Sequence, residues 1–320
     1  MIAFAAGHTM VRAQDEARER PVLIDLWYPA GAGQAEDDHD YGLGRGRVAE
    51  SAHPADARCP VIALSHGAYG AASNYAWIAE HLARRGYLVM GVSHFGESYA
   101  YGPATIDPAA ATRPWDRPVD VSFALDHVLS GTPFGERADQ RRTGALGHSS
   151  GGATVLQLGG AIYDPAAMQR YCASDAALTD RGCDYGRGAD PAAPAGQETR
   201  SYRDPRVKAI VALDPALGPG HRAASLAAIT VPVHIVGAVD NDFLPFESHA
   251  ARYARQIPGA SLTRLTGGEG HFVYLDVCDA ELDANGVPLC RDRRGVDRAL
   301  VHARLAGLIT AFFEQHLAPA

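Results

Sequence analysis

The hydrophobic residues of this chain gather in short runs that alternate with segments of helical periodicity. Residues 61–65 and 87–93 are almost continuously apolar, as is typical of central parallel strands buried on both faces. Between them, residues 73–85 place apolar side chains at helical spacing and stop at Gly86. Further along, the same alternation predicts strands at 207–213, 231–237 and 261–265, and helices at 118–129, 223–228, 246–256 and 296–316.

The N-terminal part of the chain is predicted to begin with a hairpin. Residues 8–14 and 21–29 are strand-like, and the charged segment 15–20 between them suits a turn. Residues 30–58 show no periodicity and are rich in Gly, Ala, Asp and His, so we expect a loop there. Together with the alternating strands and helices, these patterns predict an α/β fold built on one doubly wound, mostly parallel sheet.

A long irregular segment interrupts the alternation at residues 163–204. It contains Tyr163, Cys172 and Cys183 and several prolines, but no long periodic stretch. Segments of this length between a helix and the next strand usually serve function, as a lid or the wall of a pocket. With no internal repeat or linker in sight, we expect one domain over residues 1–320 that carries a lid-like insertion at 163–204.

The composition is that of an ordinary soluble globular protein. Of the 320 residues, 47% are hydrophobic and 21% charged, and the formal net charge is −8. No basic block suggests nucleic acid, and no apolar run reaches the roughly 20 residues of a membrane span. The first residues lack the basic region and the apolar length of a signal peptide. Composition does not set the oligomeric state.

The five cysteines suggest two local disulfides. Cys172 and Cys183 bracket one polar loop, and Cys278 and Cys290 bracket another. Pairing within each loop would imply an oxidising compartment, periplasmic or extracellular. The alternative is four reduced thiols in a cytoplasmic enzyme. Cys59 remains over and precedes a predicted buried strand, so we expect it to be a small buried hydrophobe.

The chemistry of the chain is predicted to centre on residues 147–152, Gly-His-Ser-Ser-Gly-Gly. An apolar run precedes this segment and a helical pattern follows it, which is the strand, sharp turn and helix of a nucleophile elbow. In such a turn Ser149 would present its hydroxyl above the sheet as the nucleophile. The backbone N–H of Ser150 would then be one donor of an oxyanion hole.

The remaining parts of a serine hydrolase site occur in the expected order. His66-Gly67-Ala68 follows the strand at 61–65, and the N–H of Ala68 is our second oxyanion donor. His271 lies in a Gly-rich loop after the last strand, where the order nucleophile, acid, histidine places the general base.

Three residues compete for the role of the acid. We favour Asp240, because it is closest to the end of the strand at 231–237. Asp242 is two residues further on and suits the cap of the following helix. Asp214 ends the preceding strand and is within reach of the same imidazole.

Other chemistries find little support in the sequence. The first strand is not followed by Gly-x-Gly-x-x-Gly, which weighs against a dinucleotide site. Asp37, Asp38, His39 and Asp40 resemble a metal cluster, but adjacent residues cannot all face one ion. We therefore predict neither a metal nor an organic cofactor.

These motifs together carry a resemblance to a known superfamily. Ser65-His66-Gly67, residues 147–152 and Gly270-His271-Phe272 resemble the α/β-hydrolases, and more narrowly bacterial predicted dienelactone hydrolases related to platelet-activating-factor acetylhydrolase. In the acetylhydrolases the acid corresponds to Asp214. True dienelactone hydrolases use a cysteine nucleophile, so that activity is not implied here. The resemblance covers nearly the whole chain and implies the fold and the triad, but not the substrate.

The sequence therefore predicts a serine hydrolase that cleaves a small-molecule carboxylic ester through an acyl-enzyme on Ser149. An amidase, a peptidase or a lactonase would use the same triad, with an amide or lactone as substrate. A non-catalytic binding protein on this fold, with a partner held by residues 163–204, is the alternative of another class.

Overall fold

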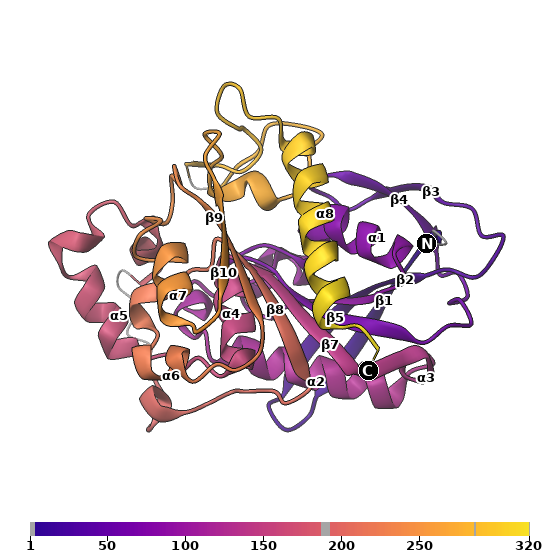
Figure 1. Cartoon of the computed structure of the whole chain (residues 1–320), viewed down its shortest axis with the longest axis horizontal. Helices are drawn as coiled ribbons and strands as arrows, with labels where there is room; N and C mark the ends of the chain where they lie inside the picture. The colour runs from indigo at the N-terminus through magenta and orange to yellow at the C-terminus, as the bar shows by residue number, and fades with distance from the viewer. Residues whose placement is uncertain (1–3, 187–192, 285, 320) are drawn as a thin grey trace.

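A central sheet organises the molecule in the computed structural model, which describes residues 4–186, 193–284 and 286–319 (Figure 1). Within these residues one sheet has ten strands. Their order across the sheet is β10 (Ser261–Leu265), β9 (Val233–Ala238), β8 (Val207–Leu213), β7 (Ala138–His148), β5 (Cys59–Ser65), β6 (Leu88–Ser93), β2 (Arg20–Pro29), β1 (Ala6–Asp15), β4 (Arg45–Glu50) and β3 (Asp37–Asp40). The strands from β10 to β6 are parallel, and β2 pairs antiparallel with both β6 and β1. The predicted doubly wound, mostly parallel sheet is confirmed.

Helices cover both faces of this sheet. They are α1 (Ala76–Arg84), α2 (Asp116–Gly131), α3 (Phe134–Arg137), α4 (Ser150–Gly159), α5 (Pro165–Cys172), α6 (Ala223–Ala227), α7 (Ala250–Gln256) and α8 (Arg298–His316). The predicted helices at 118–129, 223–228 and 296–316 agree with these bounds to within a few residues. The prediction at 246–256 begins too early, because Pro245 opens a turn that precedes α7.

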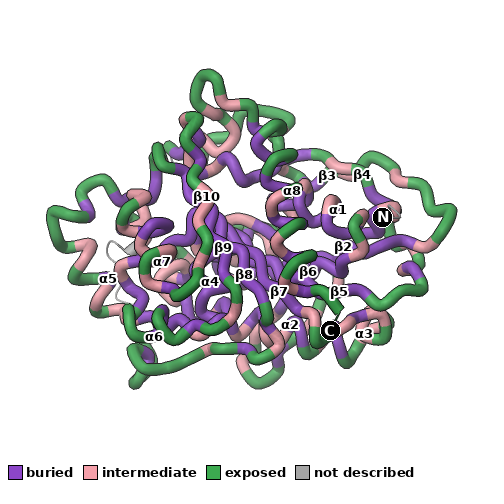
Figure 2. Tube along the Cα trace, viewed as in Figure 1, coloured by how far each residue is buried: buried purple, intermediate pink, exposed green. Residues whose placement is uncertain are grey.

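Period-two alternation along the strands divides the core into two layers. Ile62 and Leu64 belong to the buried cluster that includes α1 and α8, whereas Val61 and Ala63 point the other way and belong to the cluster that includes α2, α4, α6 and α7. Figure 2 shows the consequence, a continuous buried band along the central strands. Strands buried on both faces must be apolar throughout, and this is why the central ones can be read from the sequence.

The prediction of a loop over residues 30–58 is wrong. This segment contains β3 and β4, which pair antiparallel with each other, and β4 pairs in parallel with the start of β1. Hydrophobic periodicity misses these strands because they lie at the edge of the sheet. All four residues of β3 are polar, and in β4 only Val48 and Ala49 are buried.

The segment 163–204 folds as α5 followed by short turns of 3-10 helix at Asp175–Ala177, Arg181–Gly186 and Gln197–Thr199. Residues 187–192 of this segment lie outside the described residues. A small apolar cluster, which includes Trp115, Tyr163 and Met168, packs the segment against the rest of the protein. The described part of the segment that contributes to this cluster is therefore held by packing as well as by chain connectivity.

Both predicted disulfides are present. Cys172 is bonded to Cys183 in the segment 163–204, and Cys278 is bonded to Cys290. The second loop also holds the short strands β11 (Asp283–Ala284) and β12 (Val287–Pro288). Cys59 is free and buried, as expected.

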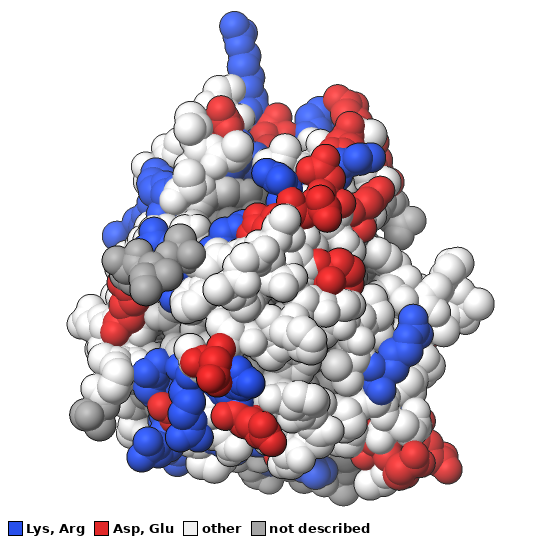
Figure 3. Space-filling model, turned by 90° about the vertical axis from the view of Figure 1, so that its right-hand side faces the viewer, with Lys and Arg blue, Asp and Glu red and all other residues white. Residues whose placement is uncertain are grey.

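The helices and the surface charges bear on membrane and nucleic-acid binding. Within the described ranges, the structure has no helix whose length and hydropathy would allow it to cross a bilayer. On the face shown in Figure 3, acidic and basic side chains lie next to each other above and below a largely uncharged middle. This face therefore presents charges of both signs rather than one extended basic area.

Candidate active site

Ser149 stands at a sharp turn between β7 and α4. Its backbone has φ 57° and ψ −119°, a left-handed conformation that is strained for a residue with a side chain. The turn is fixed from both sides, because the Ser149 N–H donates to Leu213 and the Ser149 carbonyl accepts from Ala216.

Glycines allow the chain to approach itself closely around this turn. A Cβ at Gly147 would lie 2.2 Å from the carbonyl oxygen of Gly151, and one at Gly151 would lie 1.9 Å from that of Ser65. Neither contact is tolerable for a real side chain. The glycines of the motif are thus required by packing, and they let β5, β7 and α4 converge beneath Ser149.

His271 meets the hydroxyl of Ser149. Its Nε2 lies 2.9 Å from Ser149 Oγ, and the ring is buried at the start of a 3-10 turn, His271–Tyr274. Phe243 stacks on the imidazole with ring centroids 5.2 Å apart and planes 11° from parallel. Desolvation lowers the pKa of His271 to about 3. The ring is therefore neutral at pH 7 and able to accept a proton.

Asp214, at the end of β8, is the carboxylate beside the other ring nitrogen. Its Oδ2 lies 3.6 Å from His271 Nδ1, and both side chains are at most 2% exposed. The N–H of Ala238 donates to Oδ1, and Asn241 donates to Oδ2 from 2.8 Å. Burial raises the pKa of Asp214 well above the usual value, and the bond from Ala238 opposes this shift.

Asn241 was not recognised from the sequence, although its two neighbours were. Its Oδ1 accepts the N–H groups of Phe243 and Leu244, which fixes the amide so that Nδ2 points at Asp214. The same Nδ2 is 3.3 Å from His271 Nδ1. Nδ1 of His271 therefore has two neighbours, the amide nitrogen of Asn241 within hydrogen-bond distance and Asp214 Oδ2 at 3.6 Å, and an Nδ1 proton could be accepted only by the carboxylate.

The structure does not bring Asp240 to His271. Asp240 is exposed on the turn after β9, and its backbone carbonyl accepts from Arg293. Asp242 contacts His271, but through the backbone and not the ring, because its Oδ1 accepts the His271 N–H at 2.9 Å. The three acidic residues considered from the sequence thus occupy different places, and only Asp214 faces the imidazole ring.

The loop at residues 66–68 lies directly against the nucleophile. A Cβ at Gly67 would be 3.3 Å from Ser149 Cβ. Among the described residues, no acceptor pairs with the N–H of Ala68 or of Ser150. The loop is held in place from behind, where Arg117 donates to the His66 carbonyl at 2.6 Å and pairs with Glu97 at 2.7 Å, all buried.

A chain of buried hydrogen bonds connects this loop to the base. Gly67 N–H donates to the hydroxyl of Tyr75, which donates to His148 Nδ1 at 2.7 Å. His148 Nε2 in turn donates to the carbonyl of His271 at 2.9 Å. Burial lowers the pKa of His148 well below its usual value, so the ring is neutral and carries the single proton that this arrangement requires. Tyr75 belongs to the helical pattern at residues 73–85, and nothing in that pattern marks it for this role.

A second Ser-His-Asp arrangement lies beneath the first. Ser65 Oγ is 2.9 Å from His94 Nε2, and His94 Nδ1 is 3.0 Å from Asp120 Oδ2. Arg20 pairs with the same carboxylate at 2.8 Å. The serine, histidine and aspartate are at most 1% exposed, so no substrate reaches them. This arrangement fixes the end of β5 just before the loop at 66–68.

A cavity of about 270 Å³ opens beside Ser149. The segment 163–204 supplies much of its wall, including the disulfide Cys172–Cys183. The lining is largely apolar and comprises Ala111, Thr112, Ser149, Ser150, Tyr163, Pro165, Met168, Gln169, Cys172, Ala177, Gly182, Cys183, Tyr185, Ala216, Leu217, Phe243, Leu244 and His249. The nucleophile therefore faces a pocket suited to an apolar group.

A buried hydrogen bond between two side chains fastens this wall to the core. His249 Nε2 lies 2.7 Å from Asp180 Oδ2, with both side chains almost fully buried. His249 Nδ1 accepts the N–H of Gly218, so the proton is on Nε2 and points to Asp180. Next to it, the N–H of Arg181 donates to the carbonyl of Phe243, the residue that stacks on His271.

Comparison with solved structures identifies the fold. A ferulic acid esterase from Streptomyces cinnamoneus matches 98% of this chain and 90% of its own, with a TM-score of 0.66 and 22% identity. The chain has an α/β-hydrolase fold. At this identity the likeness to the esterase extends to architecture alone.

The sequence relatives match only part of this chain. A cutinase from Thermobifida alba is 26% identical over 202 residues, and one from Thermobifida cellulosilytica is 23% identical over 201. Each match covers 62% of this chain, and the chain spans about half the length of these curated relatives. No family model matches the sequence. The narrower resemblance to dienelactone hydrolases and acetylhydrolases stays a prediction.

Proposed function

We propose that this α/β-hydrolase is a serine carboxylic-ester hydrolase with the triad Ser149, Asp214 and His271. The observation that carries the proposal is the 2.9 Å contact between Ser149 Oγ and His271 Nε2 on a strained turn that faces a cavity. Asp214 replaces Asp240 as the proposed acid, because Asp214 is buried beside His271 Nδ1 whereas Asp240 is exposed.

The proposed reaction proceeds through an acyl-enzyme. Ser149 Oγ attacks the ester carbonyl carbon while its proton passes to His271 Nε2, and Asp214 holds the Nδ1 proton. The N–H groups of Ala68 and Ser150 stabilise the oxyanion. His271 then gives its proton to the departing alcohol. Water, deprotonated by the same ring, releases the acid and restores the serine.

The relatives and the cavity favour esters over other acyl compounds. The matched proteins are named cutinase and ferulic acid esterase, and both names denote ester hydrolysis. The largely apolar cavity suits an aliphatic or aromatic group on the acyl or the alcohol side. The candidate substrates are therefore small esters with one apolar group, and amides and lactones are the alternatives for the same triad.

A labelling experiment tests the proposal. A fluorophosphonate should modify one serine per folded chain, identified as Ser149 by peptide mapping, and p-nitrophenyl esters should be hydrolysed. Ser149→Ala should abolish both, whereas Ser130→Ala, an exposed serine of α2, should change neither. Folded protein that neither reacts with the probe nor hydrolyses esters would support a non-catalytic binding protein. Faster cleavage of matched anilides or lactones would move the assignment to those classes.

We also propose an extracellular or periplasmic location. The two disulfides support this, because thiols of cytoplasmic proteins are generally kept reduced. Fractionation of the producing cells, with thiol alkylation before lysis, tests it. Recovery in the cytoplasm with four alkylated cysteines would contradict the proposal.

A further inference from the structure

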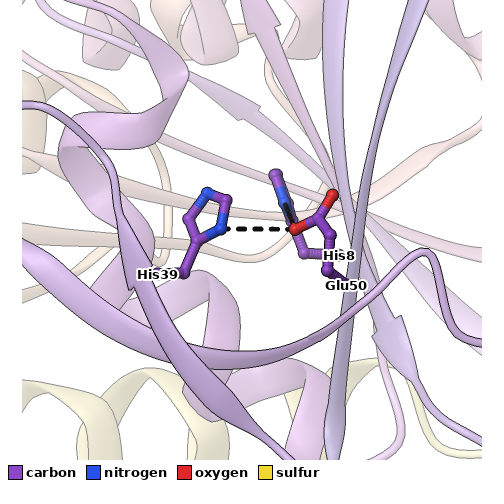
Figure 4. A group of neighbouring side chains, drawn as sticks. All are labelled: His8, His39 and Glu50. Carbon is purple, nitrogen blue, oxygen red and sulfur yellow. Dashed lines mark hydrogen bonds and ion pairs between the residues drawn. The ribbon is translucent and has the colours of Figure 1, made fainter.

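Three potential metal ligands meet at the edge of the sheet remote from β10. They are His8 on β1, His39 on β3 and Glu50 at the end of β4, and their side chains converge in Figure 4. The ligand atoms all lie within 4.8 Å of one another. None of the three residues lines the cavity at Ser149. Strand pairing creates this group, because His8 is directly opposite Glu50 in the register of β1 and β4.

The spacing of these atoms approaches that of a tetrahedral zinc site. Glu50 Oε2 lies 3.1 Å from His8 Nδ1 and 3.3 Å from His39 Nδ1. Two ligands bound at about 2.0–2.1 Å across a tetrahedral angle are about 3.3–3.4 Å apart. Two of the three ligand pairs are thus already close to this separation, and the ligand atoms of the two histidines lie within 4.8 Å of each other.

Asp25 provides independent support for a metal. His8 Nε2 lies 3.2 Å from Asp25 Oδ1, and both side chains are about 95% buried. A carboxylate on the far nitrogen of a ligating histidine is the usual outer partner of zinc-bound imidazole, because it fixes the tautomer and the ring orientation. Here it directs Nδ1 of His8 towards Glu50. Tyr41 closes one side, with its ring centroid 4.5 Å from that of His39.

We propose that His8, His39 and Glu50 bind one Zn²⁺ ion, with water in the fourth position. Two imidazoles and one carboxylate suit zinc, whereas calcium and magnesium prefer oxygen ligands alone. The ion would join β1 to the hairpin of β3 and β4 and so stabilise this edge of the sheet. Of residues 37–40, His39 is the one that would bind the ion, and the three aspartates beside it are exposed.

Zinc titration of tag-free protein tests the site. After removal of metals with EDTA, calorimetry should show one Zn²⁺ per chain, and zinc should raise the temperature of unfolding. His39→Gln and Glu50→Gln should each weaken zinc binding at least tenfold and abolish most of the thermal shift. Bound Co²⁺ should show the intense visible absorption of tetrahedral coordination in the wild type and lose it in both variants.

Matched controls separate this site from adventitious binding. Asp38→Asn removes an exposed acid of the same hairpin, and His53→Gln removes an exposed histidine nearby in the chain. Both should leave zinc affinity unchanged, and no variant should alter ester hydrolysis. Absence of zinc binding, or equal affinity in Glu50→Gln and wild type, would overturn the proposal. The group would then be an imidazolium held between Asp25 and Glu50. Glu50 is half-exposed, so Glu50→Gln decides the matter even if His39→Gln fails to fold.

Discussion

Replacing Asp214 by Asn tests the arrangement at His271 more sharply than deletion would. The native carboxylate accepts from Ala238 N–H on Oδ1 and from Asn241 on Oδ2, and it faces His271 Nδ1 with the same Oδ2. In Asp214→Asn the oxygen would remain with Ala238, and the new amide nitrogen would face Nδ1. His271 would then carry its proton on Nε2, opposite Ser149, and would be unable to act as a base.

The size of this effect follows from the tautomer. Holding a triad histidine in the wrong tautomer costs a factor of about 10⁴ in kcat in a serine protease. Here the Nδ1 to Oδ2 distance of 3.6 Å is longer than a full hydrogen bond. We therefore expect a loss of about 10³–10⁴ in kcat, or about 4–5 kcal/mol of transition-state stabilisation.

The assay is hydrolysis of p-nitrophenyl acetate, with circular dichroism to verify folding and the fluorophosphonate labelling rate as a second readout. Asp240→Asn is the control and should stay within about twofold of the wild type, because this side chain is exposed. Asp242→Ala should lose about tenfold, since it removes the acceptor of the His271 N–H. A folded Asp214→Asn with more than a tenth of the wild-type kcat, or an Asp240→Asn as impaired as Asp214→Asn, would refute the reasoning.

Three further predictions concern the surroundings of the triad. Tyr75→Phe leaves Gly67 N–H and His148 Nδ1 without a partner in the interior, so it should cost about 2–4 kcal/mol of unfolding free energy and lower kcat more than it raises KM. Urea titration measures the stability and steady-state kinetics measure kcat and KM. An unchanged kcat would show that this chain of hydrogen bonds does not position the base. The double variant Cys172→Ser and Cys183→Ser should lose about 3 kcal/mol by loop entropy and raise KM, because the disulfide forms part of the cavity wall; an unaltered KM would show that the wall does not contact substrate. Desolvation lowers the pKa of His271 to about 3, and protonation of the ring removes the base. The acidic fall in kcat/KM should therefore occur well below pH 6.5. A fall centred at or above pH 6.5 would show that the pKa of His271 is not lowered.

The sequence was most informative for strands that are buried on both faces and for turns fixed by local contacts. Strands such as β5 and β6 are apolar throughout, and the glycines around Ser149 are demanded by contacts within one turn, so both could be predicted locally. The edge strand β3 could not, because four polar residues carry no hydrophobic period. Its pairing depends on β4, which itself joins the sheet only through a short register with β1.

The choice of acid depended on which way each aspartate side chain points, and the spacing of residues along the sequence does not encode this. Asp214 and Asp240 both follow strands, but Asp214, with a positive φ of 38°, has a buried side chain, while Asp240 on the turn after β9 is exposed. The zinc ligands illustrate the same limit. His8 and His39 are 31 positions apart, and only the order of strands at the edge of the sheet brings them together.

The buried arrangement of Ser65, His94 and Asp120 bears on how hydrolases are detected by geometry. A template that searches for a serine, a histidine and an aspartate at hydrogen-bond distances matches this chain at a site with 2.9 and 3.0 Å contacts, shorter overall than those around Ser149. A distance criterion alone would therefore rank the inert group first. Backbone strain at the serine and an adjoining cavity reverse that ranking, and templates that score these two properties would avoid the error.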